Sequence, residues 1–156
     1  MQRWNLVVML LLAVVLAAGC GGKGSSNSEA ASTTTAATVA TVSAFDDGPR
    51  AAESPADDAL AERGEQLFKD KGCSACHAFG RRISCPDLDG VTMRRTAKWM
   101  ENQILHPEKM VKEDPISRQL FATYSLQMPN QGLTEAEARA VIEFFKHKNH
   151  EAQEKH

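Results

Sequence analysis

The chain has 156 residues, of which 42% are hydrophobic and 24% are charged, and its formal net charge is −2. At this length a single folded domain is expected. The near-balanced charge excludes a strongly basic nucleic-acid-binding protein, because such proteins carry a clear excess of Lys and Arg.

The first nineteen residues have the features of a secretory signal. Arg3 provides a positive start, and an apolar run, Leu6–Ala18, follows it. The run is shorter than the about 20 residues that a membrane-spanning helix needs. It ends in LAAGC at residues 16–20, which resembles the bacterial lipobox, where a lipid is attached to the cysteine. We therefore predict a lipoprotein signal over residues 1–19 and lipidation of Cys20, with an ordinary signal peptide as the alternative.

A low-complexity segment separates Cys20 from the predicted domain. Residues 20–58 are rich in Gly, Ser, Thr and Ala, and Phe45 is their only aromatic residue. Such a segment buries too little apolar surface to offset its ordering entropy, so a flexible tether is predicted. The tether would hold the domain on the periplasmic side of the cell envelope. Gly21, rather than Asp, favours the outer membrane in a bacterium with two membranes.

The remainder predicts an all-α domain over residues 59–150, followed by a disordered tail at 151–156. Asp114 is a natural N-cap followed by Pro115, and Thr134 with Glu137 forms a capping box. Strand signals are absent from the sequence. Long loops are expected at 78–95 and 125–133, and loops of this length in a small domain usually enclose something. The predicted helices cover residues 57–71, 96–105, 114–124 and 134–148.

The segment GCSACHAFG, residues 72–80, contains Cys73, Cys76 and His77. A C-x-x-C-H motif is typical of covalent haem attachment, in which two thiols reach the vinyl groups of one porphyrin and the histidine lies beneath the iron. A redox dithiol would require a βαβ context, which is missing. A zinc site would need two more ligands, for which Cys85 and His106 are the candidates. The sequence therefore predicts one covalent haem c.

The sixth iron ligand is predicted to be Met128. This methionine lies in a loop, and Pro129 after it restricts the chain. His106 is the rival ligand. The other methionines after the signal are less suitable, because Met100 falls on a helical face and neither Met93 nor Met110 is followed by proline.

Residues 64–148 resemble a monohaem class I c-type cytochrome, on the motifs GEQLFKDKGCSACH, CPDL and MPNQGLTEAEARAVIEFF. The resemblance implies that Gly64 lets the first helix cross closely over Phe144 or Phe145 in the last. It implies that the Pro86 carbonyl accepts a hydrogen bond from His77 and that Leu88 packs on the haem. It also implies that the haem propionates meet Trp99 with Arg94 or Arg95.

One position departs from the family pattern, because Cys85 stands where a glycine usually precedes the proline. With the other three cysteines assigned, Cys85 is the odd thiol. It is interpreted as a small buried residue, with a redox-active or dimer-forming thiol as the alternative.

These features predict a one-electron carrier rather than an enzyme. Its partner would be a reductase, an oxidase or a quinol-oxidising complex. The stretches HPEKMVKEDPI and MPNQGL are similar to small cytochromes associated with nitrous oxide reduction. The alternatives are a haem-based gas or redox sensor, in which Met128 leaves the iron easily, and a zinc-stapled lipoprotein without a redox role.

Overall fold

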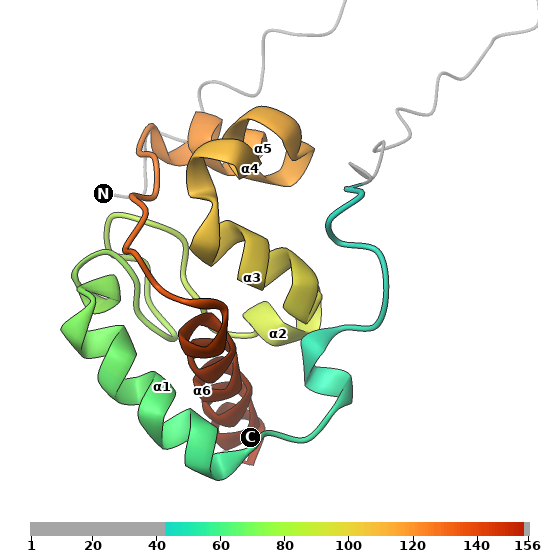
Figure 1. Ribbon diagram of the computed structural model, residues 1–156, viewed down its shortest axis with the longest axis vertical. Helices are drawn as coiled ribbons and strands as arrows, with labels where there is room; N and C mark the ends of the chain where they lie inside the picture. The colour runs from blue at the N-terminus through green and yellow to red at the C-terminus, as the bar shows by residue number, and fades with distance from the viewer. Residues whose placement is uncertain (1–42, 155–156) are drawn as a thin grey trace, which may run out of the picture. The chain divides into compact units, whose positions relative to one another are not determined.

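The computed structural model describes residues 43–154, which form helices and no strand (Figure 1). The predicted all-α class is confirmed. The signal and Cys20 lie outside the described residues, and no helix within 43–154 is long and apolar enough to cross a membrane. The elements in chain order are η1 (Ala51–Glu53), α1 (Asp58–Asp70), η2 (Cys73–Ala75), α2 (Val91–Arg94), α3 (Ala97–Leu105), α4 (Pro107–Glu113), α5 (Pro115–Tyr124) and α6 (Glu135–Glu154).

The helix starts follow the predicted caps. The Asp114 side chain accepts the Ser117 N–H at 2.7 Å, with Pro115 at the first helical position of α5. In the capping box before α6, the Thr134 N–H donates to the Glu137 carboxylate at 2.8 Å, and the Glu137 N–H donates to Thr134 Oγ1 at 3.3 Å. These side chains satisfy N–H groups that a helix leaves unpaired at its start.

Three helical stretches differ from the prediction. The expected 78–95 loop ends in the short α2, which follows Gly90 in the left-handed region at φ 64°. The chain between α3 and α5 forms α4, with Pro107 at its first position. α6 continues to Glu154, four residues into the predicted tail. An ion pair one turn apart, Lys148 with Glu151 at 2.5 Å, supports this extension.

The expected tether also ends earlier than residue 58, because residues 43–53 pack against the domain as a segment that we call the strap. The strap is drawn in cyan beside α2 and α3 in Figure 1. The Ala51 N–H donates to the Arg95 carbonyl at 3.0 Å, and Ala51 itself is buried. The Ser43 hydroxyl donates to the Asp114 carboxylate. These contacts order residues whose composition alone indicated a flexible chain.

α1 and α6 lie side by side (Figure 1), and their backbones meet at Gly64. A Cβ atom at Gly64 would lie 2.0 Å from the Ala140 carbonyl oxygen and 2.9 Å from Phe144 Cβ. The backbones therefore approach closer than any side chain allows, which confirms the close crossing expected of Gly64. The aromatic partner at the crossing is Phe144.

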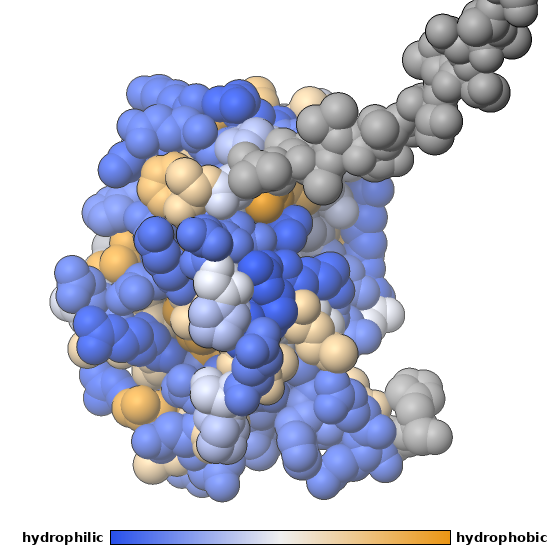
Figure 2. Space-filling model, turned by 90° about the vertical axis from the view of Figure 1, so that its right-hand side faces the viewer, coloured by the Kyte–Doolittle hydropathy of each residue, from blue (hydrophilic) through white to orange (hydrophobic). Residues whose placement is uncertain are grey.

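An aromatic cluster fills the space beside this crossing. The Phe68 ring lies 5.5 Å from Phe144 and 5.9 Å from Phe145, and Phe79 packs on the same rings at 5.6 and 5.8 Å. Tilted and edge-on arrangements at these distances are favourable for aromatic pairs. The outer face shown in Figure 2 is mostly hydrophilic, with separate apolar groups.

The crossing predicts a large effect of Gly64→Ala. Alanine favours a helix over glycine by about 1 kcal/mol. The clash with backbone atoms at Ala140 outweighs this gain, because a backbone carbonyl cannot rotate away. We expect a net loss of about 3 kcal/mol in the free energy of unfolding, measured by denaturant titration. Gln66→Ala, an exposed change in the same helix, is the control, and equal stability of the two variants would contradict the close crossing.

Candidate cofactor site

A predominantly apolar cavity opens between the helices and the two long loops. Its walls come from the helices α1 to α6 and from the loops before α2 and before α6. The cavity brings together most of the residues singled out in the sequence, although more than forty residues separate the first from the last. Those that line it include Cys73, His77, Cys85, Pro86, Leu88, Arg94, Arg95, Trp99, Met100, Met128 and Phe145.

The C-x-x-C-H motif forms one tight turn on the cavity wall. Gly72 follows the end of α1 and precedes η2, and its backbone is in the left-handed region at φ 74°, which changes the direction of the chain. The Cys73 carbonyl then accepts the N–H groups of Cys76 at 3.2 Å and His77 at 3.0 Å. Cys73 and Cys76 are half-buried, and burial raises the pKa of the Cys73 thiol. Cys76 is the one motif residue that does not line the cavity.

His77 is held in one orientation by Pro86. Its Nδ1 lies 2.9 Å from the Pro86 carbonyl oxygen, and since a carbonyl only accepts, Nδ1 carries the hydrogen. Nε2 is then the nitrogen with the free lone pair, suited to bind a metal. Burial lowers the pKa of His77, opposed by the bond to Pro86. Burial has the larger effect and favours the neutral imidazole, and the bond to Pro86 orients the ring.

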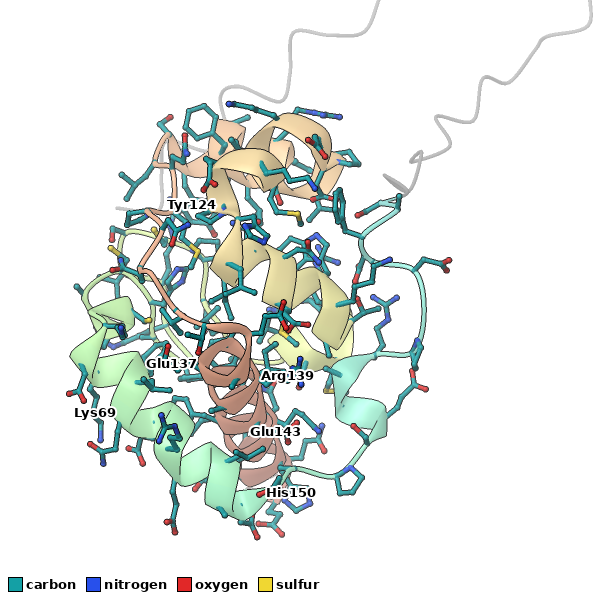
Figure 3. All side chains as sticks on the ribbon, viewed as in Figure 1. Lys69, Tyr124, Glu137, Arg139, Glu143 and His150 are labelled. Atoms are coloured by element: carbon teal, nitrogen blue, oxygen red, sulfur yellow. The ribbon has the colours of Figure 1, made fainter. Side chains whose placement is uncertain are left out.

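The 78–90 segment folds back over the motif. The Cys85 N–H donates to the Cys76 carbonyl at 3.2 Å, and the Leu88 N–H donates to the Ala78 carbonyl at 2.9 Å. Tyr124, labelled in Figure 3, lies at the end of α5. The Arg82 guanidinium lies 4.4 Å from the centre of its ring. This cation–π contact ties the loop to the opposite wall of the cavity.

Met128 lies on the loop between α5 and α6, half-buried at the cavity. The Gln103 amide nitrogen on α3 is 3.9 Å from its sulfur. The Asn130 amide anchors the same loop by donating to the Leu105 carbonyl at 2.9 Å. The rival ligand His106 is exposed and does not line the cavity. Met128 is therefore the better-placed candidate to face His77.

The resemblance places Trp99, with Arg94 or Arg95, at the haem propionates, and core packing is the alternative role for this residue. The ring lines the cavity, but the indole N–H donates to the Asp114 carboxylate at 3.1 Å. Asp114 is fully buried and also accepts hydrogen bonds from Ser43 and Ser117. Burial alone would raise the pKa of Asp114, but these hydrogen bonds hold it below its ordinary value. A buried carboxylate of this kind needs such donors, so it takes the indole N–H.

The two arginines remain at the cavity wall. Arg94 donates to the Asp89 carbonyl at 2.7 Å. Arg95 lies 5.2 Å from the centre of the Trp99 ring and donates to the Asp46 carboxylate at 3.4 Å. Their positive charges are therefore available beside the cavity, whereas the indole N–H is not.

Cys85 is buried at the edge of the cavity, in agreement with its interpretation as a small buried residue. Burial raises the pKa of its thiol, and Cys76 beside it adds to this effect. Within residues 43–154, no three His, Cys, Asp or Glu side chains are grouped to hold a metal ion. This counts against the zinc alternative, which relied on Cys85 and His106.

A family model described as Cytochrome c matches residues 61–148, more than half of the chain. The chain belongs to the cytochrome c family. As a member, it binds one covalent c-type haem and takes part in haem-based electron transfer.

Solved cytochromes c have the same fold. Cytochrome c from Rhodothermus marinus superimposes with a TM-score of 0.60 and is 35% identical, over 65% of this chain and 96% of that chain. An engineered form of it, Rma TDE, superimposes with a TM-score of 0.58 and is 34% identical over the same shares of the two chains. The structure of that engineered form bound to a carbene intermediate superimposes with a TM-score of 0.56 and is 35% identical. A comparison with curated proteins gave no match.

The residues at the cavity fit a c-type haem. The two thiols on one turn could form the thioether links, His77 Nε2 has its lone pair available, and Met128 offers a soft thioether from another element. The haem supplies the reversible one-electron chemistry when bound. The protein supplies two attachment points, an oriented imidazole and an apolar enclosure.

Two further residues at the cavity, Gln103 and Ser117, were not predicted from the sequence. Ser117 Oγ lies 2.7 Å from Gln103 Oε1 and 2.9 Å from Asp114 Oδ2, which links the buried carboxylate to the residue beside Met128. Its spacing could have indicated Gln103, since it lies one turn after Trp99 on the same face of α3. That face also has other polar residues, so the sequence did not distinguish Gln103 from them.

Trp99→Phe tests whether the indole N–H serves Asp114 or the cofactor. The ring is kept while the carboxylate loses one donor, so we expect a loss of about 2 kcal/mol in unfolding free energy near neutral pH. Because the folded-state pKa of Asp114 is depressed, the loss should shrink as the pH falls and the carboxyl becomes protonated. Haem content should be unchanged. A variant that keeps full stability but loses haem would contradict the Trp99–Asp114 bond.

Proposed function

We propose that the protein is a one-electron carrier tethered to a membrane through a lipid on Cys20. Cys73 and Cys76 would attach the haem, and His77 and Met128 would hold its iron. The observation that supports this most strongly is that His77 and Met128, which come from different loops of the domain, line the same cavity.

Two protein ligands favour electron transfer over catalysis at the iron. With His77 and Met128 bound, no coordination position is left for a substrate. Met/His ligation also raises the reduction potential relative to anionic ligands. The fixed tautomer of His77 and the anchored Met128 loop keep both ligands in place between oxidation states. Little rearrangement would then accompany each electron.

The tether defines where the carrier works. Residues 21–42 would join the lipid to the strap, which leaves the domain free to reach partners on the periplasmic side of the envelope. Gly21 favours the outer membrane if the cell has two. The proposed partner is a respiratory protein such as a reductase, with nitrous oxide reductase one candidate, an oxidase or a quinol-oxidising complex.

Met128→Ala tests the ligand set and therefore the function. Haem attachment should persist, because Cys73, Cys76 and His77 are unchanged. The reduction potential should fall, since the thioether favours ferrous iron. The reduced variant should bind carbon monoxide much faster than the parent, measured by rapid mixing. Met93→Ala, at an exposed methionine, is the control and should behave as the parent.

Fast carbon monoxide binding by the parent itself would contradict the carrier proposal. Met128 would then be a weak ligand or none. That outcome favours the alternative of a haem-based gas or redox sensor.

Cys20→Ser tests the tether. Without the thiol no lipid can be attached, and no described helix can cross a membrane. We expect the protein to move from the membrane fraction to the water-extractable fraction, with its haem intact. Persistent membrane association after cleavage of the signal would point to another anchor.

A further inference from the structure

The strap reaches the cofactor cavity through one nearly buried carboxylate, Asp46. Its side chain is only 8% exposed. One oxygen accepts the Thr96 N–H at 2.8 Å. The other accepts hydrogen bonds from Arg50 at 3.0 Å and Arg95 at 3.4 Å. A carboxylate buried to this extent is stabilised only by such donors, so the contacts hold one another in place.

Arg95 is the cavity residue in this group. Its side chain is 27% exposed and its guanidinium lies over the Trp99 ring. Within residues 43–154, its guanidinium hydrogen bonds all leave from Nη1, to Asp46 and to the Arg94 carbonyl at 3.0 Å. Nη1 has two hydrogens, and both are used. Nε and Nη2 are left to donate to an anionic group at the cavity.

The backbone adds to this placement. The Arg95 carbonyl accepts the Ala51 N–H of the strap at 3.0 Å. Arg50 of the strap donates to the Arg94 carbonyl at 2.9 Å. The strap therefore holds the arginine through its own carbonyl, its neighbour's carbonyl and its side chain. The strap thereby fixes a positive charge at the cavity wall.

We propose that Asp46 is a positioning residue that holds the Arg95 guanidinium toward the carboxylate groups of the haem, so that the strap helps to set the reduction potential. This inference rests on the proposed function. A fixed positive charge near the iron favours the ferrous state, whose net charge is lower by one. An arginine released from Asp46 would extend toward water, where solvent screens it.

The test is a double-substitution cycle read as reduction potential. Arg95→Gln is made in the parent, in Asp46→Asn and in Asp47→Asn, and each holoprotein is titrated spectroelectrochemically. Asp46→Asn keeps an oxygen for the Thr96 N–H but removes the ionic partner of Arg95. Asp47→Asn removes the same charge from the exposed neighbouring residue and is the matched control. Unfolding free energies show that each variant is folded, and Asp46→Ser replaces Asp46→Asn should the latter not fold.

Arg95→Gln should lower the potential equally in the parent and in the Asp47→Asn background. In the Asp46→Asn background the shift should fall to less than half of that value. Equal shifts in all three backgrounds, or no shift in the parent, would overturn the inference. Failure of the proposed function is a separate result, because it would appear as fast carbon monoxide binding by the parent, a measurement that involves neither Arg95 nor Asp46.

Discussion

The close contact between Gly64 of α1 and the Ala140 backbone of α6 is the constraint on which the rest of the domain depends. α1 leads directly into the turn that contains Cys73, Cys76 and His77. α6 begins shortly after the loop that contains Met128. The crossing therefore fixes the chain on both sides of the cavity. The Phe68, Phe79, Phe144 and Phe145 cluster fills the space beside it, so the two helices cannot slide without disrupting aromatic packing.

A second, polar constraint acts on the opposite side of the cavity. Asp114 accepts hydrogen bonds from the strap, from α3 and from α5, through Ser43, Trp99 and Ser117. A buried carboxylate is costly unless its hydrogen bonds are complete, so these elements are held to one arrangement. Ser117 also contacts Gln103, which lies beside Met128. The apolar enclosure of the haem is thus supported from outside by a charged network that connects with both the strap and the loop of the proposed axial ligand.

Features encoded locally could be predicted from the sequence. The caps at Asp114 and Thr134, the glycine at the helix crossing and the C-x-x-C-H turn each depend on residues close in sequence or on one steric requirement. What could not be predicted depends on tertiary contacts. The strap has a linker's composition, and it is ordered by tertiary contacts such as those of Asp46 and Ala51 with Arg95 and Thr96. Trp99 was assigned to the cofactor by resemblance, whereas the position of buried Asp114 beside it required the structure.

The central claim is that Cys73 and Cys76 attach one haem, and mass spectrometry of the denatured protein tests it most directly. The protein would be purified from a cell able to attach c-type haem. The account predicts a mass greater than that of the processed chain by one haem, retained after denaturation and lost in the Cys73→Ser, Cys76→Ser double variant. Cys85→Ser, the matched control at the third thiol of the domain, should keep the added mass. A parent chain whose denatured mass includes no haem would contradict the account.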